Sequence, residues 1–274
     1  VIVDEQHRFG VKQRSQLKEK AIVPHLLVMS ATPIPRTLAL TLYGDLDVSI
    51  LDEKPMGRKP VETMAFSKKE QHKAYQQVGV FIEKGQQAYV VCPAIEESEL
   101  ELSNVYEVYE QLKNKCFPQV GIALIHGKLP SKEKDDIMDR FSRGEIQILV
   151  ATSVIEVGID VPNANVMVIE NAERFGLAQL HQLRGRIGRG EQIGLCVLLY
   201  QGKNQDIQKR MEIMVNTNNG FQIAEEDLKM RGPGEFYGVR QSGVLEFHLA
   251  DPFRDWIILE QAHREADFIL QNDP

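Results

Sequence analysis

Two adjacent acidic residues, Asp4 and Glu5, directly follow the short apolar run 1–3. Such a run reads as a buried strand, and open α/β sheets bind ligands at the carboxyl ends of their strands. Two carboxylates there can divide the work of phosphoryl transfer, because one can hold a magnesium ion while the other orients water. Taken alone, such a pair is more often two solvated acids, so the interpretation depends on what accompanies it.

Two arginines further along the chain supply groups that suit a phosphate. Arg186 and Arg189 are three residues apart, so they share one face of a helix or turn. A guanidinium can hold a phosphoryl group through two hydrogen bonds. The alternative is a basic, solvated helix face. We expect Arg184, in the same stretch, to be solvated or structural.

Hydroxyl side chains follow two further apolar runs. Ser30 and Thr32 come after one, and Thr152 and Ser153 come after another. Hydroxyl groups can switch hydrogen-bond partners, and with backbone N–H groups they can hold a nucleic-acid phosphate without reading its sequence. These four residues are therefore candidates for coupling and for phosphate contacts.

The elements that must position these residues are short apolar runs that alternate with helical patterns, which is typical of a parallel sheet covered by helices. The predicted strands are residues 26–29, 88–92, 121–125, 146–150, 166–169 and 195–199. The predicted helices are residues 68–84, 105–115 and 131–141, with Gly85 as a helix stop and Ser131 as an N-cap.

Proline and glycine residues between the periodic stretches predict a division into domains. Two prolines and a glycine in residues 55–60 predict a linker between a partial domain, residues 1–54, and a complete one, residues 61–200. Beyond it, helical patterns replace the alternation, so residues 201–274 are expected to form a helical tail. The chain starts inside a predicted strand, and we therefore expect a fragment cut within a domain.

Composition narrows the class of protein without fixing its function. The 274 residues are 43% hydrophobic and 26% charged, with no apolar run long enough to span a membrane. Three widely spaced cysteines, Cys92, Cys116 and Cys196, suggest neither a zinc cluster nor a disulfide framework, which fits a reducing cytoplasm. The formal net charge of -7 argues against a general coat of nucleic-acid-binding charge but allows a local basic track.

Four motifs in order carry a family resemblance. They are Asp4-Glu5, Ser30-Ala-Thr-Pro33, Ala151-Thr-Ser153 with Gly158-Ile-Asp160, and Gln182-Leu-Arg-Gly-Arg-Ile-Gly-Arg189. Each is weak alone, but their order and spacing resemble the superfamily 2 helicases and translocases. The resemblance covers essentially the whole chain. It implies RecA-like domains, each an α/β fold with a parallel sheet flanked by helices, with ATP between two domains and nucleic acid across their top.

Longer strings narrow the resemblance to RecG. Residues 4–10, 31–39 and 220–243 look like that family, and Gln6 stands where the related transcription-repair coupling factor usually has an acid. The stretch from residue 221 to residue 243 resembles the translocation motif that those two families share. The resemblance therefore favours double-stranded DNA over RNA as the track.

The resemblance implies roles at the nucleotide. Asp4 would hold Mg²⁺ and Glu5 would activate water, while Arg186 and Arg189 would be arginine fingers for ATP. The other residues implied to face the nucleotide are His7, Gln182, Gly158 and Asp160, and those implied to couple it to DNA are Ser30, Thr32 and Glu156. A buried, satisfied histidine and a turn glycine are the ordinary alternatives for His7 and Gly158.

The resemblance also implies a set of DNA contacts. These residues are Thr152, Ser153, Lys128, Arg231, Arg240 and Gln241. For Lys128 the alternative is a solvated lysine. For the tail arginines it is a packing appendage in which they pair with Glu225, Glu226 and Asp227.

A loop of the form Gly-x-x-x-x-Gly-Lys-[Ser/Thr] occurs nowhere in the sequence. In the family that loop precedes the Asp-Glu motif, so we expect the fragment to fold but to hydrolyse little ATP alone. The expected parent is a monomeric, ATP-dependent translocase that remodels branched double-stranded DNA, such as stalled forks and recombination junctions. The alternatives are a coupling-factor type of translocase and a non-catalytic DNA-binding module, and intact Glu5, Arg186 and Arg189 argue against the latter.

Overall fold

A computed structural model describes residues 1–4, 25–30, 49–51, 53, 59–93, 99–152, 161–188, 190, 192–231 and 255–272. The chain divides into two compact units. Residues 51–230 form the sheet unit, and residues 1–50 with 231–274 form the terminal unit. None of the described helices combines the length and the apolar character that crossing a bilayer requires.

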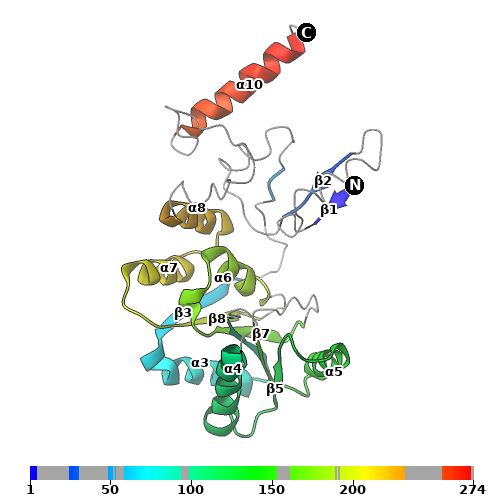
Figure 1. The fold of residues 1–274 in the computed structure, drawn as a ribbon, viewed down its shortest axis with the longest axis vertical. Helices are drawn as coiled ribbons and strands as arrows, with labels where there is room; N and C mark the ends of the chain where they lie inside the picture. The colour runs from blue at the N-terminus through cyan, green and yellow to red at the C-terminus, as the bar shows by residue number, and fades with distance from the viewer. Residues whose placement is uncertain are drawn as a thin grey trace. The chain divides into compact units, whose positions relative to one another are not determined.

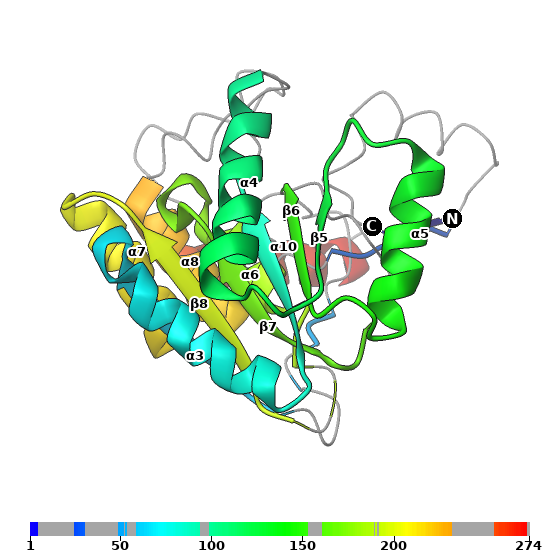
Figure 2. The ribbon, with the colours of Figure 1, turned by 90° about the horizontal axis from the view of Figure 1, so that it is seen from below.

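The sheet unit is built on six parallel strands in the order β3-β8-β7-β4-β6-β5 (Figures 1 and 2). They are β3 (Val61–Ser67), β4 (Gln87–Cys92), β5 (Ile122–Ile125), β6 (Ile148–Thr152), β7 (Ala164–Ile169) and β8 (Gly194–Tyr200). The central strands are buried along their whole length, as expected for a parallel sheet covered on both faces. The predicted α/β class is confirmed.

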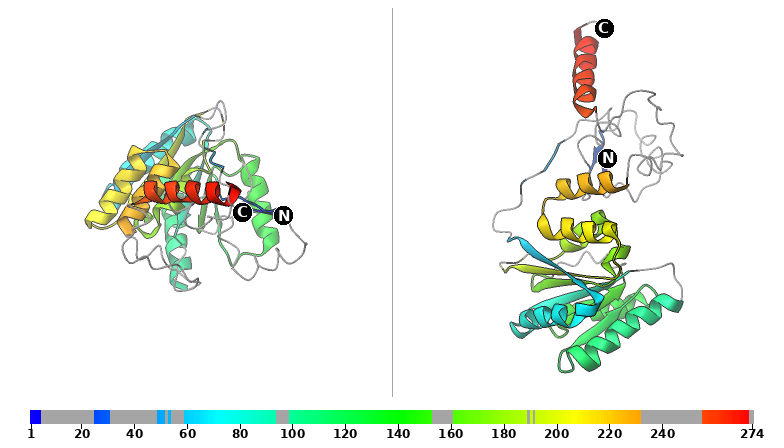
Figure 3. Two further views of the ribbon diagram at one scale, coloured as in Figure 1. Left: turned by 90° about the horizontal axis from the view of Figure 1, so that it is seen from above. Right: turned by 90° about the vertical axis from the view of Figure 1, so that its left-hand side faces the viewer.

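Helices cover both faces of this sheet, as the side view in Figure 3 shows. They are α3 (Gln71–Glu83) after the 3₁₀ turn η2 (Lys68–Glu70), α4 (Glu99–Gln111) with the π-helical turn η3 (Leu112–Cys116), α5 (Ser131–Ser142), the 3₁₀ turn η4 (Ala172–Arg174), α6 (Leu177–Arg184) and α7 (Gln205–Asn216). Helix α8 (Gly220–Arg231) lies beyond α6 and α7 from the sheet (Figure 1). Alternate strand residues enter two core clusters, one with α3 and α4 and the other with α5, α6 and α7. The three cysteines are unpaired.

The expected elements in this unit are found with two corrections. The five strands predicted here are present, and Gly85 has φ of +77° just after α3, as a helix stop requires. Strand β3 was not predicted. The N-cap prediction for Ser131 was wrong, because Ser131 is the first residue of α5 and Pro130 precedes it without a side-chain cap.

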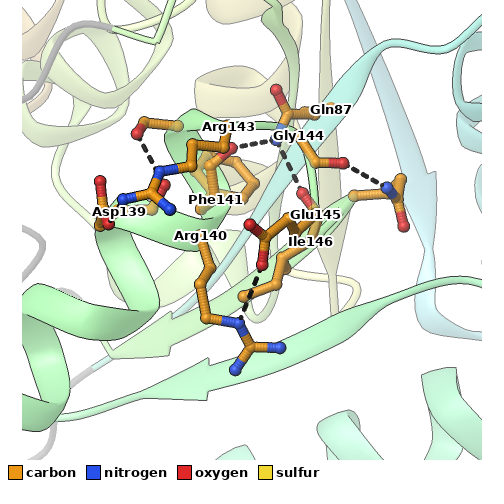
Figure 4. Close-up of polar contacts among 10 residues, drawn as sticks. Gln87, Asp139, Arg140, Phe141, Arg143, Gly144, Glu145 and Ile146 are labelled. Atoms are coloured by element: carbon orange, nitrogen blue, oxygen red, sulfur yellow. Dashed lines mark hydrogen bonds and ion pairs between the residues drawn. The ribbon is translucent and has the colours of Figure 1, made fainter.

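Neutral side-chain amides close the amino end of the sheet (Figure 4). The Gln87 amide nitrogen donates to the carbonyl oxygens of Phe141 at 2.6 Å and Ile146 at 2.7 Å. The Gln147 amide donates to the Gly144 carbonyl at 2.7 Å. The turn after α5 is therefore fixed to the sheet by amides that bond its backbone carbonyls, and the Phe141 carbonyl also accepts from the Gly144 N–H at 3.0 Å.

The terminal unit contains a short parallel pair and one long helix. Strand β1 (Ile2–Val3) pairs with β2 (Leu27–Val28), which lies within the predicted strand 26–29. Helix α10 (Trp256–Asn272) lies near the carboxyl terminus. Val3 is buried, whereas Ile2 and Leu27 are exposed.

Candidate functional site

Many of the residues singled out from the sequence lie outside the described part of the chain. They are Glu5, His7, Thr32, Ser153, Glu156, Gly158, Asp160, Arg189, Arg240 and Gln241. Arg231 is described only as the last residue of α8. The roles of these residues remain predictions, and the geometry of the site rests on Asp4, Ser30, Lys128, Thr152, Gln182 and Arg186.

Asp4 and Ser30 leave the same edge of the β1–β2 pair. Val3 is aligned with Val28, and the Met29 N–H donates to the Val3 carbonyl at 2.8 Å. Asp4 directly follows β1, and Ser30 comes two residues after β2, so a carboxylate and a hydroxyl follow the carboxyl ends of neighbouring parallel strands. Both residues are exposed. This is the edge at which open α/β sheets bind ligands.

The Asp4 carboxylate at this edge is a donor of the kind that Mg²⁺ takes. Mg²⁺ keeps several waters and is held by one or two carboxylates plus substrate phosphates. Across the described ranges no group of three or more His, Cys, Asp or Glu side chains could hold a metal.

Thr152 and Lys128 lie at the carboxyl ends of two neighbouring strands in the sheet unit. Thr152 ends β6, and His126 follows β5, whose last residue is aligned with Ala151. Thr152 and His126 are nearly buried, whereas Lys128 is exposed. The fold thus places a hydroxyl, an imidazole and an ammonium group at or after the ends of neighbouring strands, although residues 126 and 128 lie 26 and 24 positions before residue 152.

His126 has a tyrosine hydroxyl and two lysines in its surroundings. The Tyr106 hydroxyl is 3.3 Å from Nε2 of His126, and its Nδ1 is buried without a hydrogen-bond partner. Lys134 donates to the Gly127 carbonyl at 2.8 Å. Burial, together with Lys134 and Lys128, lowers the pKa of His126. The local positive charge therefore comes from the lysines rather than from the imidazole.

Tyr106 and Lys134 were missed as site residues from the sequence. Lys134 lies in the first turn of α5, where acidic residues are favoured by the helix dipole, so a lysine there was the available signal. Tyr106 carried no such signal, because one aromatic residue in an amphipathic helix is usually part of the core.

Gln182 and Arg186 lie on α6 and in the turn that follows it. Both are partly buried. Arg184 between them is 3% exposed, and its guanidinium donates to the Thr63 hydroxyl at 3.2 Å and to the Met214 carbonyl at 2.7 Å. Burial lowers the pKa of Arg184. Of the two expectations for Arg184, the structural one is confirmed, and this anchor fixes the end of α6 just before Arg186.

Comparison with known families agrees with this fold. Residues 71–191 match the helicase conserved C-terminal domain. Residues 217–274 match the C-terminal part of domain 3 of the ATP-dependent DNA helicase RecG. The first match contains most of the sheet unit, and the second begins just before α8.

Individual relatives extend the similarity to the whole chain. The chain is 49% identical over 278 residues to the RecG helicase of Bacillus subtilis, covering 100% of this chain and 40% of the relative. It is 53% identical over 284 residues to that of Aquifex aeolicus, covering 100% of this chain and 36% of the relative. The chain therefore spans well under half of these relatives.

Solved structures support the same relationship. A structure of RecG bound to a three-way DNA junction matches with a TM-score of 0.70 and 48% identity, covering 95% of this chain and 33% of that chain. The helicase MrfA, solved with DNA and AMPPNP, matches with a TM-score of 0.56 at 18% identity, covering 80% and 33% of the two chains, and shows the fold alone. Over its whole length, this chain belongs to the RecG helicase family.

Proposed function

We propose that this chain is part of an ATP-dependent helicase that translocates on double-stranded DNA and remodels branched DNA. The observation that carries the proposal is the extent of the similarity, about half of all residues over the entire chain, with relatives named ATP-dependent DNA helicase RecG. The match of residues 217–274 to RecG domain 3 favours this reading over a coupling-factor type of translocase.

The residues proposed to bind and hydrolyse ATP are Asp4, Glu5, Arg186 and Arg189. ATP with Mg²⁺ would supply the phosphoryl group and the cation that neutralises it. Asp4 would hold the ion and Glu5 would orient the attacking water, with Arg186 and Arg189 holding the transferring group. The residues proposed to complete the nucleotide contacts are His7, Gln182, Gly158 and Asp160. The exposed position of Asp4 after β1 and the anchored end of α6 support this assignment.

The proposed DNA contacts lie at the carboxyl ends of strands in the sheet unit and in the tail. Thr152 and Lys128 at neighbouring strand ends, beside Lys134, offer the hydroxyl and positive charge that a backbone phosphate needs. The other proposed DNA contacts are Ser153, Arg231, Arg240 and Gln241. The residues proposed to couple nucleotide to DNA are Ser30, Thr32 and Glu156.

The proposal includes the domain organisation expected from the sequence. Residues 1–54 would be the remnant of a first RecA-like domain, residues 55–60 a linker, residues 61–200 a second RecA-like domain, and residues 201–274 a helical tail. The proposed protein acts in the cytoplasm as a monomer. The parallel β1–β2 pair and the six-stranded sheet support the two RecA-like assignments.

A chimera tests the proposal directly. These 274 residues replace the matching part of the Bacillus subtilis relative, and ATP hydrolysis is measured with and without three-way junction DNA. We expect DNA to stimulate hydrolysis and Arg189→Ala to lower the stimulated rate by about 10³-fold, as for an arginine finger. Arg143→Ala, which changes an exposed arginine at the amino end of the sheet, is the matched control. A folded chimera that binds the junction but never hydrolyses ATP would contradict the motor and favour a non-catalytic DNA-binding module.

A further inference from the structure

The connection from β7 to α6 begins with a buried acid, Glu170, for which the proposed function has no role. Its side chain is fully buried and accepts hydrogen bonds from the Tyr75 hydroxyl at 2.5 Å and from the Lys68 ammonium at 2.7 Å. A buried charge is costly unless it is both paired and hydrogen-bonded. Glu170 meets both conditions, through residues about a hundred positions away in the sequence.

The partners of Glu170 come from separate elements of the sheet unit. Lys68 begins η2 directly after β3, and Tyr75 lies on α3. The backbone N–H of Glu170 donates to the Val91 carbonyl on β4 at 2.8 Å. Burial and the charge of Glu170 raise the pKa of Tyr75, so the phenol stays a hydrogen-bond donor. One residue therefore ties the end of β7 to three neighbours.

The residues after Glu170 are held in an uncommon conformation. Asn171 has φ of 50°, and within the described ranges no other residue except glycine has a positive φ. Such a conformation persists only where the surroundings fix it. Further along the same connection, the Gln201 N–H donates to Glu173 at 3.0 Å and the Arg210 guanidinium donates to the Phe175 carbonyl at 3.2 Å.

This fixed connection leads directly into α6. The Gln179 side chain accepts from the Gly176 N–H at 3.1 Å, and α6 then runs to Arg184, two residues before Arg186. Catalytic groups must be placed closely, since a displacement of about 1 Å can cost roughly 10²-fold in rate. An anchor at the start of α6 therefore matters for a group presented at its end.

We infer that Glu170 is a positioning residue for Arg186: held by Lys68 and Tyr75, it fixes the start of α6, and α6 in turn presents Arg186. The inference rests on the proposed function, in which Arg186 contacts the transferring phosphoryl group. The buried ion pair is by itself weak evidence for a purely stabilising role, because well-packed apolar residues replace buried ion pairs at no loss in many proteins.

Hydrogen exchange on the 274-residue chain tests the anchor without any activity. We expect Glu170→Gln to speed exchange of the amides of residues 171–186 by about 10-fold relative to the other helices of the sheet unit, since local opening is what exchange reports. Glu145→Gln, which removes an acid from an exposed ion pair with Arg140, should leave those amides unchanged. Tyr75→Phe removes one hydrogen bond and no charge. This variant is measured in place of Glu170→Gln if Glu170→Gln does not fold.

Kinetics of the chimera test the consequence for Arg186. At a temperature where every variant is folded, Glu170→Gln should lower kcat for ATP hydrolysis by about 10-fold and leave KM within about twofold, as for an interaction made only in the transition state. Adding Lys68→Met to Glu170→Gln should not lower kcat further. Unchanged exchange and unchanged kcat would overturn the inference, as would a fall in kcat that only follows the folded fraction.

The two proposals fail in distinguishable ways. If the unsubstituted chimera hydrolyses no ATP, the proposed function fails, and hydrogen exchange still decides whether Glu170 fixes the start of α6. If the chimera is active and Glu170→Gln matches the Glu145→Gln control in both measurements, only the positioning role of Glu170 is overturned.

Discussion

The two ends of the six-stranded sheet are held by different chemistry. At the amino end, the side chains of Gln87 and Gln147 bond backbone carbonyls, and no charge is involved in those contacts. At the carboxyl end, Glu170 is buried against Lys68, and His126 is nearly buried between a tyrosine and lysines. The same strands thus have an uncharged closure at one end and ionisable groups at the end where ligands bind.

This difference follows from what each end must do. The turn after α5 contains backbone carbonyls, such as that of Ile146, and a neutral amide bonds them without the cost of burying a charge. The carboxyl end has a buried imidazole nitrogen, Nδ1 of His126, without a partner. In the described part of the chain, buried polar atoms without a partner occur at both ends, because Oε1 of Gln86 and Oδ1 of Asn165 lie near the amino end, so the two ends differ in charge and not in how completely their polar groups are bonded.

The largest expected effect is the loss of the Gln87 amide. Gln87→Leu leaves the Ile146 carbonyl buried without this donor and removes one of the two donors to the Phe141 carbonyl, which should lower the free energy of unfolding by about 1–3 kcal/mol. Urea unfolding of the 274-residue chain measures it. Gln86→Leu is the matched control, since the Gln86 side chain is also buried but, among the described residues, its amide nitrogen donates to the exposed side chain of Gln192 and to no backbone carbonyl. Equal losses in the two variants would show that the amino end is not held by these amides.

A smaller expected effect is on the pH dependence of stability, which should involve the carboxyl end of the sheet and not the amino end. Burial, aided by Lys134 and Lys128, lowers the pKa of His126 in the folded chain below the value near 6.5 of an unfolded histidine. The folded state then binds fewer protons, so this stabilisation is present above about pH 6.5 and is lost as the pH falls through the folded pKa. His126→Gln should therefore lose less stability than the unsubstituted chain between pH 7.5 and 5.5.

The pH series has an internal control at the other end of the sheet. Gln87→Leu changes no ionisable group, so its unfolding free energy should fall with pH in parallel with that of the unsubstituted chain. If the unfolding free energy of His126→Gln also falls in parallel with that of the unsubstituted chain, then the imidazole has the same pKa in the folded and unfolded states. The two ends of the sheet would then not differ in how their stability depends on pH.

The sequence predicted the central strands because each one is a continuous run of apolar residues, which can be recognised without knowing the rest of the fold. Strands β4, β6, β7 and β8 are buried on both faces and appear as continuous apolar runs. Strand β3 was missed because it lies at an edge, where buried Val61 and Thr63 flank the exposed Glu62 directly after the proline-rich stretch. An edge strand with polar positions resembles a loop when only neighbours in sequence are considered.

The sequence predicted those site residues that lie at or just after the ends of strands. Asp4, Ser30 and Thr152 were expected at or just after strand ends, and the structure places them there. Glu170 was not, because an acid after a strand is indistinguishable in sequence from a solvated one. Its partners Lys68 and Tyr75 lie 102 and 95 residues away, and only the order β3-β8-β7-β4 brings them to it.

The smallest expected effect concerns the ion pairs that surround the amino-end amides in Figure 4. Arg143 pairs with Asp139 one turn before it on α5, and both side chains are largely exposed. An exposed pair gains little, because water and salt screen it and two long side chains lose freedom. Arg143→Ala should therefore change the free energy of unfolding by about 0.5 kcal/mol or less, and 0.5 M NaCl should remove most of that difference. A loss comparable to that of Gln87→Leu would mean that surface charge, and not the buried amides, holds the turn after α5, and the uncharged closure would no longer distinguish the two ends of the sheet.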